Sequence, residues 1–226
     1  MSIPKTSAGS GKIYLWNNII AEWWCGKKEY DFDLISSKWT ILSRNWYYYW
    51  YFQDWRFYSY WNQTNYNWWF AYTQIEDDAS EYNIITFEQF CNSWTIKLWN
   101  RRCATIICNT TPVMSWWNPS IWTWIWQCLP QQSASWYDAN WWIYFCEEQP
   151  VVRRAWQYSA NTDYTLKSII NLNTKSVEHF VNWSSVWTWT ISDSVINTFR
   201  QWWFNYVCMQ GWDYAIHKSV KITLEK

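Results

Sequence analysis

Three kinds of side chain in this sequence could carry chemistry: two histidines, groups of carboxylates, and many aromatic rings. His179 follows Glu178 with no serine or cysteine nearby to suggest a triad, and His217 stands alone. Glu147 and Glu148 are adjacent, so on a strand or a helix they diverge and suit paired acid–base catalysis poorly. No nucleophile-elbow, zinc-protease or complete phosphate-loop motif is present. We therefore predict that the protein is not an enzyme.

Metal binding has little support in the sequence. Three consecutive carboxylates occupy residues 76–78, but no EF-hand spacing follows, so we interpret 75–83 as a solvated loop. Seven cysteines without a C-x-x-C pair, together with two histidines, match no zinc module. We predict reduced, mostly buried thiols, no metal site and no cofactor. Three glycosylation sequons, at Asn62, Asn109 and Asn182, keep secretion open as an alternative.

The aromatic residues are the main candidates for a binding site. The stretch "WYYYWYFQDWRFYSYW", residues 46–61, holds twelve aromatic rings in sixteen positions. Exposed rings stack on sugars, on nucleobases or against another protein. The candidate glycan or interface aromatics are Trp55, Tyr58, Tyr60, Trp61, Trp122 and Trp124.

Charge argues against a nucleic-acid partner. The chain has 18 basic and 18 acidic residues, which gives a formal net charge of +0, and no basic groove is evident. Two arginine doublets are candidates for anion contacts, although ordinary surface charge is the simpler explanation and the one we favour: Arg101, Arg102, Arg153 and Arg154.

The composition favours strands. Tryptophan occurs 27 times and glycine only 4 times, and Ile, Thr, Asn, Ser and Tyr are abundant. We predict an all-β sandwich with a few short helices, including one over the capping-box pattern at 86–89. Because 162–207 is compatible with helix, an α+β fold is the alternative. So few glycines are unusual in an all-β chain, since tight turns need positive φ, although Asn can take some of those positions.

One domain accounts for nearly the whole chain. Residues 1–12 are predicted to be a flexible N-terminal arm, and 13–226 a single β-sandwich domain. The N-terminus has no apolar signal core, and no apolar stretch is long enough to span a membrane. We therefore predict no membrane partner, and we favour a location in a virion or inside the cell.

Part of the sequence resembles the coat proteins of small icosahedral viruses. The segments "WRFYSYWNQTN" and "SEYNIITFEQFCNSWTIKLWNRR", residues 55–65 and 80–102, are similar to the middle of their single jelly roll. This resemblance implies a jelly-roll sandwich that assembles with further copies of itself. Such coats often carry a basic arm for the genome, whereas residues 1–12 hold only Lys5 and Lys12.

Two further resemblances point to ligand binding. "FYSYWN", "FAYT", "NPSI", "EHFVNW" and "MQGWDY" occur in the order found in family-11 xylanases, which are also jelly rolls. The positions of that family's two catalytic glutamates hold Trp122 and Gln210, so the resemblance implies a glycan groove without hydrolysis. "TFEQF", "TPVMSWW" and "WTWTISDSVINTF" resemble messenger-RNA cap-binding factors, but Trp116 is followed by Trp117 and Asn118, without the expected glutamate.

These observations lead to one fold and three functional hypotheses. The fold is an all-β sandwich of the jelly-roll type. The first hypothesis is a structural, self-assembling protein of the viral coat type, which forms a homo-oligomer. The alternatives are a glycan-binding or inactive xylanase-like jelly-roll module, and a designed scaffold without natural function.

Overall fold

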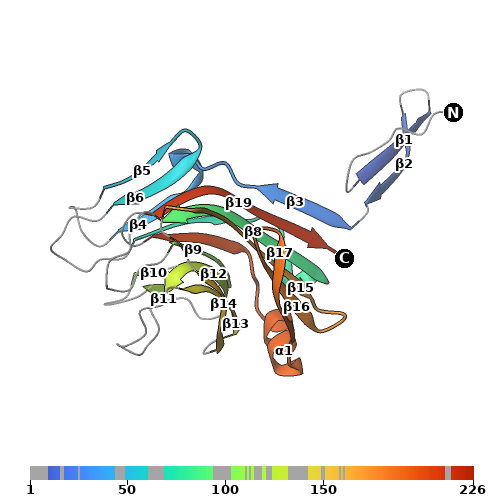
Figure 1. Ribbon diagram of the computed structural model, residues 1–226. Coiled ribbons are helices and arrows are strands. Elements are labelled where there is room, and N and C mark those ends of the chain that lie inside the picture. The colour runs from blue at the N-terminus through green and yellow to red at the C-terminus, as the bar shows by residue number, and fades with distance from the viewer. Residues whose placement is uncertain are drawn as a thin grey trace.

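The computed structural model describes most of the chain. The described residues are 10–15, 18–24, 26–43, 49–60, 69–93, 103–109, 111, 113–114, 119–120, 124–131, 142–148, 151–157, 159, 161–211 and 215–226. They form two antiparallel sheets packed face to face, with the strands of one crossing over those of the other (Figure 1). The protein is an all-β jelly-roll sandwich, as the sequence predicts.

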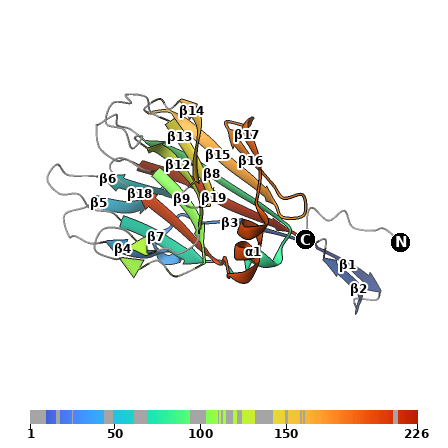
Figure 2. The same ribbon diagram turned by 90° about the horizontal axis from the view of Figure 1, so that it is seen from below.

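The first sheet has seven strands in the order β14-β13-β12-β9-β18-β7-β4. In that order the strands span Val151–Gln157, Trp142–Glu148, Trp124–Gln131, Cys103–Cys108, Tyr206–Gly211, Trp69–Gln74 and Thr40–Ser43. All neighbours are antiparallel. Seen from below, β9, β18 and β7 lie side by side in this sheet (Figure 2).

The second sheet has eight strands. Seven follow the order β17-β16-β15-β8-β19-β6-β5, and β3 (Lys27–Asp31) also pairs with β19. The seven span Ser184–Thr190, Ser176–Val181, Asp163–Asn171, Ile84–Ser93, Ala215–Glu225, Arg56–Tyr60 and Tyr49–Gln53.

The remaining elements are short. Strands β1 (Ser10–Leu15) and β2 (Asn18–Trp24) pair apart from the two sheets, and β10 (Val113–Met114) pairs with β11 (Pro119–Ser120) (Figure 1). The described helices are η1 (Ser36–Lys38), η2 (Ala79–Glu81) and α1 (Asp193–Gln201). None of them is long and apolar enough to cross a membrane. Residues 10–12 of the predicted arm belong to β1, and 1–9 lie outside the described residues, so the single-domain boundaries stay a prediction.

The core lies between the two sheets and follows the alternation of the strands. In β15, Tyr164, Leu166, Ser168 and Ile170 are buried, whereas the residues between them are partly exposed. From the opposite sheet, Ile107, Val207 and Met209 fill the same core. Each fully buried Leu, Ile or Phe contributes about 1.5–3 kcal/mol relative to an exposed position, so this alternation stabilises the sandwich.

The short helix predicted at 86–89 is wrong, and the helical alternative fails for part of 162–207. Residues 86–89, which match a capping box, lie in β8, and residues 163–171 and 176–181 form β15 and β16. Tertiary pairing overrides local propensity here, because these segments supply the inward rows of a sheet. The helix after 192 is confirmed: Ser192 Oγ accepts a hydrogen bond from the Val195 N–H at 3.4 Å and caps α1.

The acidic segment 75–83 anchors α1 and is more than a solvated loop. Arg200 of α1 donates hydrogen bonds to Ser80 O at 2.6 Å, to Tyr82 O at 2.8 Å and to Asn83 Oδ1 at 2.6 Å. Asp78 Oδ1 accepts from the N–H groups of Ser80 and Phe204, both at 2.9 Å. These contacts fasten the helix to the edge of the sandwich.

We predict that Arg200→Ala lowers the free energy of unfolding by about 1–2 kcal/mol, because it removes charge-assisted bonds to three acceptors. Urea unfolding measures this change. The control is Lys175→Ala, which removes an ion pair between two side chains that are 51% and 73% exposed, and should cost under about 0.5 kcal/mol. Equal losses in the two variants would show that packing alone holds α1.

Candidate functional site

The middle of the seven-stranded sheet is not open on its outer side. Thr105 and Ile107 point into the core, so Ile106 and Cys108, which alternate with them on β9, lie on the outward row. Ile106 is 7% exposed, and Cys108 and the neighbouring Cys208 are fully buried. These described positions offer no exposed side chain, whereas the outer face of the eight-stranded sheet has an exposed carboxylate at Asp163 and half-buried rings at Tyr51 and Tyr58, so it is the better candidate.

One cross-strand row on that outer face joins five strands. Asp163 pairs with Asn92, Asn92 with Ile216, Ile216 with Tyr58, and Tyr58 with Tyr51. These five residues are called the Asp163–Tyr51 row below. It lies outward because the chain neighbours Cys91, His217 and Phe57 are buried on the core side of β8, β19 and β6.

The polar end of the row is held by Lys218. A register shift between His217 and Ser219 places Lys218 at a bulge of β19. Its Nζ donates to Asp163 Oδ1 at 2.6 Å and to Oδ2 at 2.5 Å, and lies 5.1 Å from the centroid of the Phe90 ring. Asn92 Nδ2 donates to Asp163 Oδ1 at 2.6 Å. The carboxylate is thus fixed in position.

The surroundings of Asp163 favour its charged form. Partial burial raises the pKa of this carboxyl, but hydrogen bonds from Lys218 and Asn92, and the positive charges of Lys218 and Arg56, outweigh it. The pKa of Asp163 therefore lies below its ordinary value. The group remains a hydrogen-bond acceptor at neutral pH.

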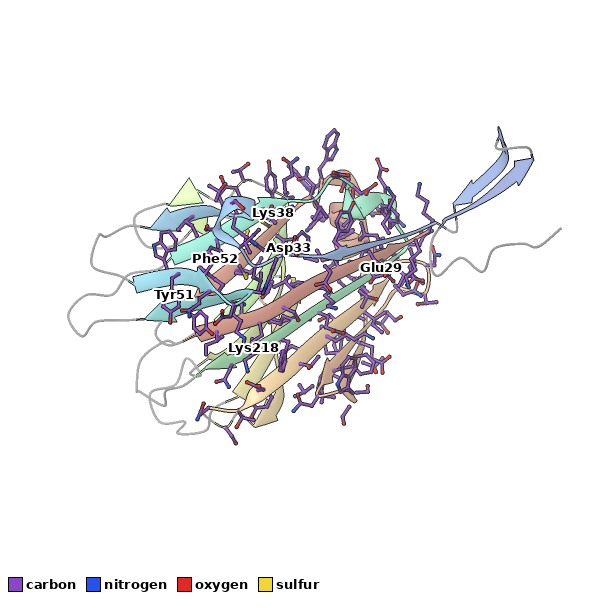
Figure 3. All side chains as sticks on the ribbon, turned by 90° about the horizontal axis from the view of Figure 1, so that it is seen from above. Glu29, Asp33, Lys38, Tyr51, Phe52 and Lys218 are labelled. Carbon is purple, nitrogen blue, oxygen red and sulfur yellow. The ribbon has the colours of Figure 1, made fainter. Side chains whose placement is uncertain are left out.

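The aromatic end of the row is a stacked pair. The rings of Tyr51 and Tyr58 lie 4.7 Å apart between centroids with an angle of 14° between their planes. Both are half-buried, and Ile216, only 8% exposed, lies between them and the polar end. Figure 3 looks onto this side of the molecule and labels Tyr51 and Lys218.

Only part of the aromatic set predicted from sequence comes together. Trp55, 63% exposed, occupies the turn between β5 and β6, and Tyr58 and Tyr60 follow it in β6. Trp124 lies in β12 of the other sheet. Trp61 and Trp122 lie outside the described residues.

The arginine doublets do not join this site in the described structure. Arg153 and Arg154 belong to β14, the edge strand of the seven-stranded sheet. Arg101 and Arg102 lie outside the described residues. Their contacts with anions stay a prediction.

The polar residues of the row, and the lysine that contacts them, are missed by sequence reasoning. Asp163, Asn92 and Lys218 come from three strands, and two of those residues fall in segments whose strand pattern is ambiguous. The available signal is the alternation of "IITFEQFCNS" in β8, which places Asn92 on the face opposite Cys91.

Both histidines lie in the interior. His179 Nδ1 lies 2.8 Å from Ser168 Oγ. His217 Nδ1 lies 3.4 Å from Thr105 Oγ1, and its Nε2 lies 3.5 Å from Cys103 Sγ. Within the described part of the chain no three His, Cys, Asp or Glu residues could together hold a metal ion.

The described thiols have no catalytic environment. Cys91, Cys103, Cys108 and Cys208 are buried and form no disulfide, as predicted for reduced thiols. Burial raises the pKa of Cys103 well above its ordinary value, so its thiol stays protonated and unreactive.

Solved carbohydrate-binding domains have a similar fold. No family model and no curated protein matches the chain in sequence. The winged bean acidic lectin, solved with methyl-alpha-D-galactose, has a TM-score of 0.55 at 10% identity over 88% of this chain and 98% of the lectin. The metal-free carbohydrate recognition domain of Emp46p gives 0.53 at 10% identity, over 85% and 95% of the two chains.

A phage protein has the same architecture. The CBM2 module of the evolved Dit protein of Lactobacillus casei BL23 phage J-1 gives a TM-score of 0.52 at 11% identity, over 88% of this chain and 97% of that one. These likenesses show the jelly-roll fold alone. They give no support to the coat-protein or xylanase resemblance.

We predict that the Lys218–Asp163 pair stabilises the fold only while Asp163 is ionised. Because its pKa is lowered on folding, Asp163 stabilises the folded state above the ordinary value of about 3.9, and this contribution is lost as the pH falls through the lower folded value. Urea unfolding should show Asp163→Asn less stable than the parent at about pH 6, with the gap closing below about pH 3.9.

A second variant tests the cause of this shift. Lys218→Met should raise the pKa of Asp163 toward its ordinary value, as followed by NMR titration of the carboxyl carbon. An unchanged pKa in that variant would contradict the assigned role of Lys218.

Proposed function

We propose that the protein is a glycan-binding module whose site is the Asp163–Tyr51 row. The observation that carries this proposal is that one outward row of a lectin-like jelly roll has a fixed hydrogen-bonding end and a stacked aromatic end. Sugars present both hydroxyl groups and an apolar ring face, so they need both kinds of contact.

The polar end supplies acceptors and a donor for sugar hydroxyl groups. The Asp163 carboxylate is held by two side chains, and ionised acceptors form stronger hydrogen bonds than neutral ones. Asn92 Oδ1 is buried and accepts no hydrogen bond within the described part of the chain. A buried acceptor without a donor is costly, and a bridging water would satisfy it.

The aromatic end supplies a stacking surface at a fixed distance. Asp163 and Tyr51 lie four strand spacings apart, or about 19 Å at roughly 4.8 Å per strand. A ligand that contacts both ends must be extended, so an oligosaccharide suits the row better than a single sugar. Zero net charge is compatible with a neutral glycan.

The site as described favours binding over hydrolysis. Glycoside hydrolysis uses two carboxyl groups on either side of the bond. Asp163 is the only carboxylate in the Asp163–Tyr51 row, and its lowered pKa makes it a poor proton donor at neutral pH.

Self-assembly, a second functional hypothesis, is favoured by a separate feature. Strand β17 is at the edge of its sheet, is exposed at six of its seven positions, and carries no charged residue to discourage pairing with another strand. Size-exclusion chromatography with light scattering measures the outcome. A particle much larger than the 28.0 kDa chain would favour assembly, and a monomer would contradict it.

We predict that Tyr58→Ala and Asp163→Ala each weaken binding to a neutral oligosaccharide at least about tenfold, or about 1.4 kcal/mol. A glycan array would choose the oligosaccharide, and calorimetric titration would measure its affinity. The control is Tyr206→Ala. Tyr206 is a half-buried tyrosine of the other sheet, and its ring centroid lies 6.3 Å from that of Tyr72. Equal affinities in all three variants would place the site elsewhere, and no binding on the array would remove the function.

A further inference from the structure

The tryptophans of this protein are distributed unlike large apolar residues. Of the eight whose exposure the structure describes, six are exposed: Trp55, Trp183, Trp187, Trp189, Trp202 and Trp203. These six are also all of the exposed large hydrophobic residues in the described part of the chain. Phe, Ile and Leu fill the core, although a buried tryptophan would remove more apolar surface from water.

Two of the exposed tryptophans occupy glycine-type backbone positions. The β5–β6 hairpin turns through Asp54 and Trp55, with φ of 51° and 58°, and the β16–β17 hairpin through Asn182 and Trp183, with φ of 48° and 69°. Positive φ at both central residues defines the type I′ turn, for which Asp-Gly and Asn-Gly are the preferred sequences. Gly26 has a φ of 69°, the same value as Trp183. A bulky side chain is strained in this region.

One tryptophan behaves as the residue normally does. Trp39 is 6% exposed, packs into the core, and donates a hydrogen bond from Nε1 to Asp33 O at 2.9 Å. The described tryptophans therefore include two contrasting cases: Trp39 is buried with its N–H bonded, whereas Trp55 and Trp183 are exposed at turns.

The amino-acid composition shows an excess of tryptophan and a deficit of glycine. Tryptophan occurs 27 times and glycine only 4 times. Glycine is ordinarily among the commonest residues, and an all-β chain needs it in its turns. The excess of one residue and the deficit of the other have the sign expected if many tryptophan positions are glycine positions.

We propose that Trp55 and Trp183 are glycine positions of this fold, and that the cell that makes the protein reads the codon at these positions as glycine. The codon with this property is UGA, which different translation systems read as stop, as tryptophan or as glycine. A gene that uses UGA for glycine shows tryptophan at those positions when UGA is read as tryptophan. Tryptophans encoded by UGG, as we expect for Trp39, stay tryptophan in both readings.

This inference leaves the proposed binding site intact, because the Asp163–Tyr51 row contains no tryptophan. It removes Trp55 from the aromatic set predicted from sequence. It also accounts for a hairpin such as Asn182–Trp183 without any ligand.

Two measurements test the inference directly. The gene should carry UGA at positions 55 and 183 and UGG at position 39. Peptides of the protein purified from its own cells should contain glycine at 55 and 183, and its intact mass should lie below the 28.0 kDa of the tryptophan-bearing chain. UGG at both turn positions, or tryptophan in both peptides, would overturn the proposal.

Stability provides an independent readout. In the tryptophan-bearing chain, Trp55→Gly and Trp183→Gly should each raise the melting temperature by about 2–4 °C, since glycine relieves the strain at positive φ. The matched control, Trp39→Gly, should lower it sharply, because it empties a buried position. A fall in melting temperature in both turn variants would overturn the inference. Oligosaccharide titration of those variants should match the parent, so failure of this inference and failure of the glycan proposal are distinguishable.

Discussion

Hydrogen bonds that cross between the two sheets constrain the whole sandwich. Gln89 of β8 donates from Nε2 to Gln127 O at 3.0 Å and accepts from Thr105 Oγ1 at 2.7 Å, so it joins its sheet to β12 and β9. In return, Gln127 Nε2 donates to Phe87 O at 2.9 Å and to Ser168 Oγ at 2.8 Å. All of these groups are buried, and a buried polar group that loses its partner costs about 1–3 kcal/mol.

These buried bonds fix which residues face outward. Gln89 lies opposite Val220 of β19 and Leu166 of β15, so its inward position sets the register of three strands. A slip of one residue would move Gln89 to the surface and the outward residues into the core. Asn92, three residues further along β8, is therefore held on the outward face, beside Asp163 and Ile216. The candidate site therefore depends on buried hydrogen bonds between the two sheets, although its own residues take no part in them.

The fold class could be predicted from the sequence, and the pairing of distant strands could not. Rings and β-branched residues indicate strands, and Ser192 correctly marks the start of α1. Residues 163–181 were ambiguous because Ser168 and His179 are polar residues on the inward rows, which interrupts the apolar alternation of β15 and β16. Their burial follows from a hydrogen bond between strands, and no local pattern contains that information.

The candidate site was accessible to sequence reasoning only at its aromatic end. Tyr58 stands out through the ring density of its segment, whereas Asp163, Asn92 and Lys218 meet only after β15, β8 and β19 have paired and a bulge has turned Lys218 toward the carboxylate. Ring density also predicts binding at tryptophans such as Trp55, whose backbone conformation and exposure are those of a turn residue. The backbone conformation separates these two cases: Tyr58 lies in a regular strand and stacks on Tyr51, whereas Trp55, three residues earlier, has a φ of 58° and an exposed ring. A residue type is therefore evidence for a binding site only where the backbone beneath it suits that residue, and the Asp163–Tyr51 row meets this condition.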